Sequence, residues 1–401
     1  MKTTLVLFLI CISSLSYGQL PFVNDIDISQ KDYVLNFDQI NDIVVKKYSH
    51  LENKKINIDS LYQVFKSKVS KVESKETYFK CLLNYFSELR NSHTTIYLAD
   101  YGLKASVRMI ENRLFIEKVN ENVFTNIGIK EKNEIIEIDG MPTIDWLESQ
   151  RKFVSASTTA HDINNALWLV FNGKFKVTRH YSIKTVNGVK EVTVNIKNPV
   201  GYSLLFPRDE VKSFGESLNE SSGYISIKSM TGNVVNEFKE AYTSLLDKPN
   251  LIIDLRDNTG GSSGLSEQIA RFLLRNSQKA CVSRKKIKPY SNSYKGNLYV
   301  LVGVKTASAA ESFAIDLLES ENVVLIGSRT AGDTGNGPSN FKTDYGISFR
   351  IPIRKPQVSI KNFPMEGIGI PPHHKVIQTV EDYKNGVDTV LEFTLNKLIG
   401  S

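Results

Sequence analysis

Cysteine is scarce in this sequence, with three residues among 401. One of them, Cys11, lies in the leader segment described below. The other two, Cys81 and Cys281, are far apart and belong to no Cys-x-x-Cys pair. This excludes a disulfide framework and a cysteine-rich metal site. We expect both residues to be small buried hydrophobic groups.

Long apolar runs are also missing. The run at residues 5–12 is shorter than the roughly 20 apolar residues that a membrane-spanning helix needs. With the preceding lysine and a small-residue tail it predicts a secretory signal peptide, residues 1–18, cleaved before Gln19. Ile10 precedes Cys11 where lipoprotein processing prefers a small residue, so no lipid anchor is expected. We therefore expect export to the periplasm or the medium without a stable membrane anchor.

Strong charge of one sign is absent as well. The formal net charge is +7, and the charges are spread along the chain apart from short runs such as SRKKIK at 283–288. No nucleic-acid-binding motif accompanies that run, and a charge run is most often a solvated face. Nucleic acid is therefore not expected as a partner. Repeats and low-complexity linkers are likewise not evident.

Three regions differ in their hydrophobic pattern. Residues 19–101 show apolar positions at helical spacing, which predicts a small helical module. In residues 102–200, apolar and polar residues alternate in short runs that are separated by turn signals. This predicts a β domain with one helix near 143–154. Residues 201–401 alternate strands with helices, and the strands are almost continuously apolar. This predicts an α/β domain with a mostly parallel, covered sheet, whose functional residues gather at the carboxyl ends of strands.

Ser308 lies where one of these buried strands runs straight into a helix, in YVLVGVKTASAAESFAIDLL. A hydroxyl at such a joint is near backbone N–H groups and the positive end of a helix dipole, as a serine nucleophile requires. The N–H of Ala309 can point at a developing oxyanion. An ordinary helix N-cap serine would give the same local pattern.

A second buried strand ends in a Gly-Gly loop, in LIIDLRDNTGG. Glycine allows close backbone approach, so an N–H of Gly260 or Gly261 is the candidate second oxyanion donor. We expect Asp254 and Arg256 to form a structural ion pair that fixes this loop.

The candidate base is His93, which closes the helical module in the turn RNSHTT. Glu366, in the glycine-rich tail MEGIGIPPHHKV, could orient a histidine and stabilise its charged form. His373 and His374 could instead suggest a metal site. Adjacent residues on an extended chain point in different directions, however, and no acidic or cysteine cluster lies nearby. We therefore expect neither a metal nor a cofactor.

Together these segments resemble the superfamily of tail-specific (C-terminal processing) and tricorn-core serine peptidases. DLRDNTGG, TASAAE and EGIGIPP are similar to its strand-loop, nucleophile and tail motifs. GIKEKNEIIEIDGMPTIDW at 128–146 is similar to the core of a PDZ domain. The resemblance covers nearly the whole chain after the leader. It implies a ClpP/crotonase-like α/β catalytic domain, a PDZ-like domain at 102–200, and a protein or peptide substrate.

The resemblance also bears on the base. The processing-protease branch uses a Ser-Lys dyad with the lysine about 25 residues past the serine. That count reaches Asp333, and no lysine lies between Lys305 and Lys342. The tricorn-like branch uses a Ser-His pair, which LRNSHTT matches.

The tricorn-like branch implies Ser308 as nucleophile and His93 as general base. Ser92 and Glu366 would then bridge and orient the imidazole, and Gly260 or Gly261 and Ala309 would supply oxyanion N–H groups.

The chain departs from the family at Pro372-His373-His374, where family tails carry an aspartate. The carboxylate-binding loop of a PDZ domain is not obvious in YGLKASVRM. Two alternatives to a secreted serine endopeptidase remain. One is an inactive protein on the same fold that binds peptides or apolar ligands, and the other is a hydrolase of non-peptide esters. The sequence gives no oligomeric state.

Overall fold

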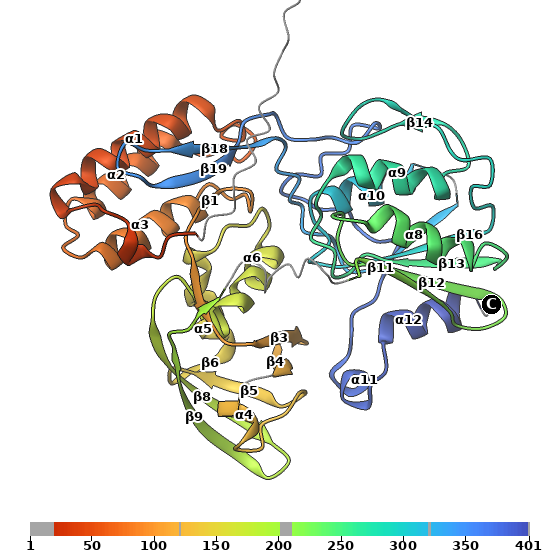
Figure 1. Cartoon of the computed structure of the whole chain (residues 1–401), viewed down its shortest axis with the longest axis horizontal. Coiled ribbons are helices and arrows are strands. Elements are labelled where there is room, and N and C mark those ends of the chain that lie inside the picture. The colour runs from red at the N-terminus through yellow and green to blue at the C-terminus, as the bar shows by residue number, and fades with distance from the viewer. Residues whose placement is uncertain (1–19, 120–121, 201–210, 320–321, 400–401) are drawn as a thin grey trace, which may run out of the picture.

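The computed structural model describes residues 20–119, 122–200, 211–319 and 322–399. The expected signal peptide lies outside these residues. Figure 1 shows helices on one side, a β-rich lobe below them, and an α/β lobe on the other side. Within the described residues, no helix has the length and apolar character to cross a bilayer.

The helical module is built on three helices with an aromatic core. Asn57 and Ser74 cap the second and third helices by accepting backbone N–H groups, as polar N-cap residues do. The predicted helices are confirmed. The elements of this module are η1 (Val23–Asp25), η2 (Gln30–Asp32), α1 (Tyr33–Lys47), α2 (Ile58–Val69), α3 (Lys75–Ser87), β1 (Thr95–Ile96), β18 (Pro338–Lys342) and β19 (Ser348–Pro352).

The last two of these elements come from far along the chain. β19 pairs antiparallel with β1, and β18 pairs with β19. Ile347, Phe349 and Ile351 are fully buried in the core of the helical module. Figure 1 shows this blue hairpin lying along the orange helices. The sequence places residues 201–401 in the α/β domain, whereas the structure buries the apolar residues of this hairpin in the core of the helical module.

The β domain is an antiparallel sheet in the order β3-β4-β5-β8-β9, with β6 beside β5. Its predicted strands and the helix near 143–154 are confirmed, whereas α6 was not expected. The elements are β2 (Asp100–Gly102), β3 (Ala105–Ile110), β4 (Arg113–Val119), α4 (Asn122–Thr125), β5 (Glu134–Ile138), β6 (Met141–Pro142), α5 (Thr143–Gln150), η3 (Arg151–Phe153), α6 (Thr159–Ala166), η4 (Leu167–Val170), β7 (Asn172–Gly173), β8 (Val177–Thr185), β9 (Gly188–Ile196) and β10 (Pro199–Val200).

The α/β domain has a six-stranded sheet in the order β11-β12-β13-β16-β17-β20, parallel except at β11. The predicted fold class is therefore confirmed. Its elements are β11 (Ser213–Ser217), β12 (Ser222–Ile227), α8 (Val234–Thr243), β13 (Asn250–Asp254), α9 (Ser263–Leu273), β14 (Gln278–Lys279), β15 (Lys286–Ile287), β16 (Asn297–Val302), α10 (Ala309–Leu318), β17 (Val323–Gly327), β20 (His374–Lys375), α11 (Val380–Asn385), α12 (Thr389–Phe393) and η5 (Thr394–Ile399).

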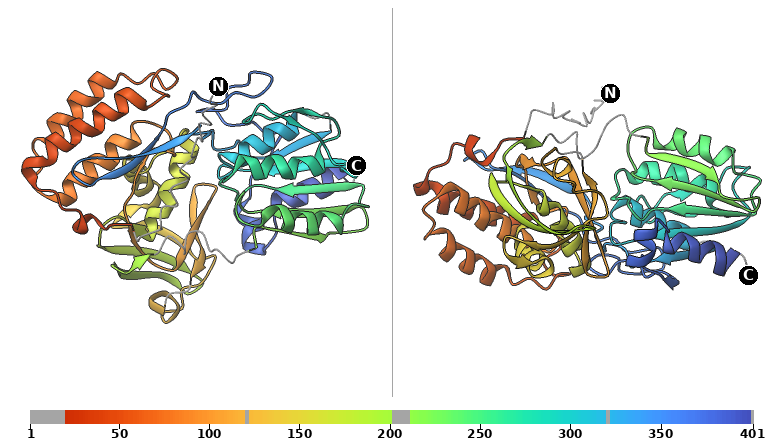
Figure 2. Two further views of the ribbon diagram at one scale, coloured as in Figure 1. Left: turned by 45° about the horizontal axis from the view of Figure 1, so that its top comes forward. Right: turned by 90° about the horizontal axis from the view of Figure 1, so that it is seen from below.

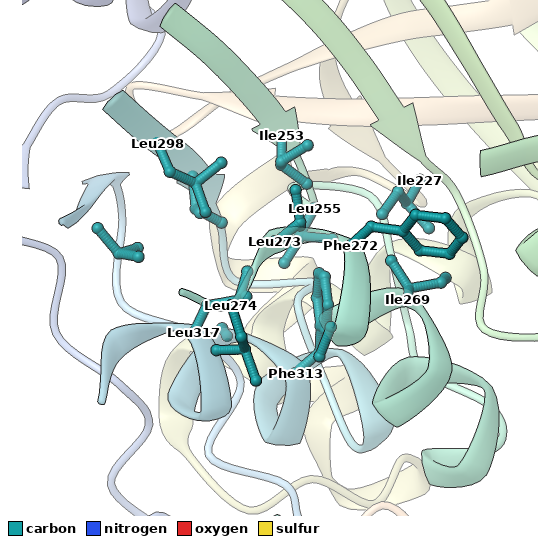
Figure 3. Close-up of a cluster of buried hydrophobic side chains, with 14 of the residues drawn as sticks. Ile227, Ile253, Leu255, Ile269, Phe272, Leu273, Leu274, Leu298, Phe313 and Leu317 are labelled. Carbon is teal, nitrogen blue, oxygen red and sulfur yellow. The ribbon is translucent and has the colours of Figure 1, made fainter. Parts of the chain in front are cut away.

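The two faces of this sheet are covered differently. Helices α8, α9 and α10 pack on one face, where Figure 3 shows Ile253 and Leu255 facing Leu273 and Phe313. The opposite face, with Ile252, is covered by the C-terminal α12. The same layers of helices, sheet and C-terminal helix can be followed in Figure 2. Strands buried on both faces explain their continuous apolar sequence.

The C-terminal segment also joins two domains. Tyr383 on α11 packs its ring against Phe115 of β4 with centroids 5.5 Å apart. Val380 N–H donates to Glu111 at the β3–β4 turn. A few residues later, Asp388 accepts two hydrogen bonds from Arg256 of the α/β domain. The segment therefore fixes the β domain beside the α/β domain.

Replacing Phe349 by alanine should destabilise the helical module more than the rest of the protein. Phe349 is fully buried against Phe86, and large-to-small aromatic changes in a core cost about 3–5 kcal/mol. Urea unfolding and amide exchange over residues 33–98 measure the effect. Phe214→Ala, at a 42% exposed position, is the matched control and should change stability little. Equal losses in the two variants would contradict this assignment.

Candidate active site

Residues from all three modules line one open cleft. Ser308, His93 and Asp333 border it together with Gly260 and Gly261. The structure therefore brings the expected nucleophile, the expected base and the expected Gly-Gly loop to one place. From the sequence, Asp333 was considered only as the position where the processing-protease branch has its lysine.

Ser308 is the N-cap residue of α10, a few residues after β16 ends. Its backbone has φ +54° and ψ −121°, a strained conformation for a residue with a side chain. The Ser308 N–H donates to the carbonyl of Asp333 at 3.0 Å. The Ser308 side chain does not cap the helix, so its hydroxyl stays available to the cleft. This is the geometry of a strained strand-to-helix turn that presents a nucleophile.

His93 reaches Ser308 from the other side of the cleft. His93 Nε2 lies 3.3 Å from Ser308 Oγ, within reach of proton transfer. Its backbone N–H donates to Asn91 Oδ1, and the following β1 is paired with β19. A Cβ at Gly335 would overlap the ring at Nδ1, so glycine is needed there for the imidazole to fit.

The other ring nitrogen of His93 faces Asp333, with Nδ1 3.2 Å from Oδ1. Burial opposes ionisation of Asp333, but the attraction and hydrogen bond of His93 outweigh it and hold the pKa well below its usual range. Ser157 Oγ also donates to Oδ1, at 3.0 Å. Ser308, His93 and Asp333 thus have the mutual arrangement of nucleophile, base and orienting carboxylate.

Glu366 does not occupy that third place. Its Oε1 is 2.5 Å from Lys54 Nζ and accepts from Asn91 Nδ2, and its Oε2 accepts from the N–H and hydroxyl of Thr334. Within the described residues no hydrogen bond or ion pair joins Glu366 to His93, so its expected orienting role stays a prediction. Glu366 acts on His93 only indirectly, through Asn91, because its oxygens are already engaged by Lys54 and by the backbone beside Asp333.

Ser92 was expected to bridge His93 and Glu366. It lines the cleft, but within the described part of the chain no hydrogen bond joins its hydroxyl to either residue. Ser157, a residue of the β domain, is the serine that contacts the orienting carboxylate instead. No local sequence signal marks Ser157, because its partner is distant in the chain.

The oxyanion donors can now be distinguished. Gly260 donates its N–H to Asn258 Oδ1 at 2.8 Å, so this group is not free to bind an oxyanion. A Cβ on Gly260 would come within 2.7 Å of Ser308 Cβ, which explains the need for glycine. The N–H groups of Gly261 and Ala309 have no hydrogen-bond acceptor among the described residues. They are the remaining candidates beside Ser308.

The Asp254–Arg256 pair is confirmed as structural. Arg256 donates to both oxygens of Asp254 and also to Asp388, which ties the loop to the C-terminal segment. His50 lies in a buried turn with Nε2 3.2 Å from the Arg354 carbonyl oxygen. His373 accepts the N–H of Leu325, which holds the tail against β17. Within the described residues, no group of three or more His, Cys, Asp or Glu is placed to hold a metal ion.

Glu311 supports the Asp333 loop from beneath. It is completely buried on α10 and accepts the N–H groups of Gly332 and Asp333 and the hydroxyl of Thr330. Burial raises its pKa to about 8, although these hydrogen bonds work in the opposite direction. Sequence reasoning did not assign a role to this glutamate of TASAAE.

The raised pKa of Glu311 makes stability depend on pH. The folded protein keeps this proton between about 4.5 and 8, whereas the unfolded chain releases it, so the free energy of unfolding falls as pH rises through that window. Glu311→Gln does not titrate and should lose less stability from pH 5 to pH 8 than the wild type. Urea unfolding at both pH values measures this. Exposed Glu216→Gln should follow the wild type, and a parallel course of Glu311→Gln would refute the assignment.

Comparison with known families gives two matches. Residues 221–376 match Peptidase family S41, and residues 109–196 match the N-terminal domain of the S41 peptidase family of Bacteroidetes. Carboxy-terminal processing protease CtpA of Bacillus subtilis (strain 168) is 26% identical over 275 residues, which is 65% of this chain and 53% of CtpA. The chloroplastic carboxyl-terminal-processing peptidase 1 of Arabidopsis thaliana is 27% identical over 273 residues, 64% of this chain and 50% of that protein.

The chain thus spans about half the length of these curated relatives. Among solved structures, mature CPAF has a TM-score of 0.76 at 15% identity and covers 92% of this chain and 98% of its own. A structure described as a "putative peptidase from Parabacteroides merdae ATCC 43184" has a TM-score of 0.54 at 17% identity, with 92% of this chain and 96% of its own covered. The tricorn protease scores 0.53 at 17% identity, with 92% and 37% covered. These structures share the fold. With the two family matches and the curated relatives, they show that the chain belongs to the S41 superfamily of tail-specific and tricorn-core serine peptidases.

Proposed function

We propose that this chain is an exported serine endopeptidase of the tricorn-like Ser-His branch. One observation carries the proposal. A single imidazole, that of His93, lies 3.3 Å from Ser308 Oγ and 3.2 Å from Asp333 Oδ1, through its two different nitrogens. The residue 25 positions after Ser308, where the other branch has a lysine, is the aspartate that contacts this imidazole.

The chemistry follows from these contacts. His93 Nε2 takes the proton of the Ser308 hydroxyl while Oγ bonds to the carbonyl carbon of the peptide. The oxygen of the tetrahedral intermediate faces the N–H groups of Gly261 and Ala309, and the imidazolium is stabilised by ionised Asp333. His93 then gives its proton to the leaving amine, and water releases the acyl group in a second round with the same residues.

The proposed substrate is a protein or peptide chain. An open cleft bordered by three modules admits an extended segment rather than only a small ester. Residues 102–200 would be the PDZ-like domain, and β3 lies at the edge of its sheet. Export rests on the sequence of residues 1–18.

A fluorophosphonate probe tests the proposal directly, because it labels activated serines. The wild type should be labelled, Ser308→Ala should not, and His93→Ala should react at least about 1,000-fold more slowly since the base is lost. The labelling rate of Asp333→Asn should be lower by about the same factor, because this variant favours the wrong tautomer of His93. Intact-protein mass spectrometry over time gives the rates.

Ser217→Ala, at an exposed position on β11 outside the cleft lining, is the matched control and should react like the wild type. If the wild type stays unlabelled from pH 5 to pH 9, a binding protein on the same fold becomes the better description. If His93→Ala reacts at a near-normal rate, the base has been misassigned. A slow Glu366→Gln together with a normal Asp333→Asn would return the orienting role to Glu366.

A further inference from the structure

The β domain contacts the loop that bears Asp333. Thr158 Oγ1 donates to the carbonyl oxygen of Ala331 at 2.8 Å, and Ser157 Oγ donates to Asp333 Oδ1 at 3.0 Å. A Cβ on Gly332 would approach Thr158 Cγ2 to 2.8 Å, so the two segments are in close contact. The segment 155–161 of the β domain is therefore packed directly on the loop at 331–335.

A second imidazole lies on the far oxygen of the same carboxylate. His161, at the start of α6, has a side chain that is 6% exposed, with Nδ1 3.9 Å from Asp333 Oδ2. Within the described residues, both of these buried atoms lack a hydrogen-bond partner. An unpaired buried polar atom is costly, and here two such atoms of complementary type face each other. A movement of about 1 Å would give both atoms their hydrogen bond.

We propose that Ser157 and His161 are positioning residues that hold Asp333 against His93, so that the β domain completes the active site. This inference rests on the proposed function. Ser157 shares Oδ1 with His93, and His161 serves Oδ2, which together fix the plane of the carboxylate. The distance between His161 Nδ1 and Asp333 Oδ2 shortens as positive charge develops on His93. Catalytic hydrogen bonds that are long in a free enzyme commonly tighten in this way during the reaction.

The protonation state of His161 is compatible with this role. Burial lowers the pKa of His161, which leaves it neutral and able to donate from Nδ1. The charged or titratable groups that act on it are Asp333, His93 and Glu366. A neutral donor adds no positive charge next to the imidazolium of His93, so it can position Asp333 without competing for its charge.

Two pairs of variants of the full chain test the inference. Ser157→Ala and His161→Leu remove the donors, whereas Ser157→Thr and His161→Asn keep a donor at nearly the same place. Fluorophosphonate kinetics separate the inactivation rate constant, which reports the nucleophile, from the reversible affinity of the probe. Misplacement of a catalytic group by about 1 Å costs up to roughly 100-fold. We expect the first pair to lose about 10- to 100-fold in the rate constant with unchanged affinity, and the second pair to recover most of it.

His180→Leu is the matched control. This exposed histidine lies on β8 of the same domain, away from the cleft, and its loss should leave labelling unchanged. Thermal unfolding of every variant accompanies the kinetics, so that a general loss of stability is recognised. The conservative variants keep the test valid if an alanine or leucine variant folds poorly.

A second readout does not require peptidase activity. The Nδ1 proton of His93, hydrogen-bonded to Asp333, should give a far-downfield proton NMR resonance that is absent from His93→Ala. Loss or an upfield shift of this resonance in Ser157→Ala and His161→Leu supports the inference even if the wild type is never labelled, in which case only the proposed function fails. A wild type without this resonance, or variants that keep both the resonance and the rate constant, would overturn the inference.

Discussion

The buried carboxylate of Asp333 is the constraint on which the rest of the structure depends. A carboxylate without solvent exposure is tolerated only when it is paired and hydrogen-bonded, and its partners here come from the two modules outside the α/β domain. His93 comes from the helical module and Ser157 from the β domain. Glu311 of the catalytic domain accepts its backbone N–H. The charge that serves the proposed chemistry therefore also holds the three modules in one arrangement.

Two further carboxyl groups hold the loop at 331–335, and they differ in the kind of partner that binds their oxygens. Glu366 is neutralised by Lys54 and anchors Thr334. Glu311 accepts hydrogen bonds from neutral donors, and burial raises its pKa although these bonds lower it. Because these groups surround a strained Ser308 and a close-packed Gly335, small shifts in the loop would move the imidazole directly. Rigidity of this kind is what preorganised proton transfer requires.

The sequence predicts the parts of the site that local patterns determine. Ser308 between an apolar strand and a helix, the Gly-Gly loop, and His93 at the end of a helical module all follow from spacing and residue type, and the structure brings them together. Their roles stay predictions until measured. The partner of His93 could not be read from the sequence, because the choice between Asp333 and Glu366 depends on which residues reach each carboxylate across long distances in the chain. Lys54, Asn91 and Ser157 make these contacts, and neither Lys54 nor Ser157 lies in a recognisable motif.

The β18–β19 hairpin has a consequence for the order of events during synthesis. The strand that pairs with β1, just after His93, ends at Pro352, so most of the chain must be made before the helical module can close its core. Contacts between such distant segments form late in folding because loop closure is slow. The growing chain therefore contains the turn with His93 long before β19, which holds that turn through β1, has been made. Any chemistry that depends on the placement of His93 would therefore arise only when most of the chain has been made.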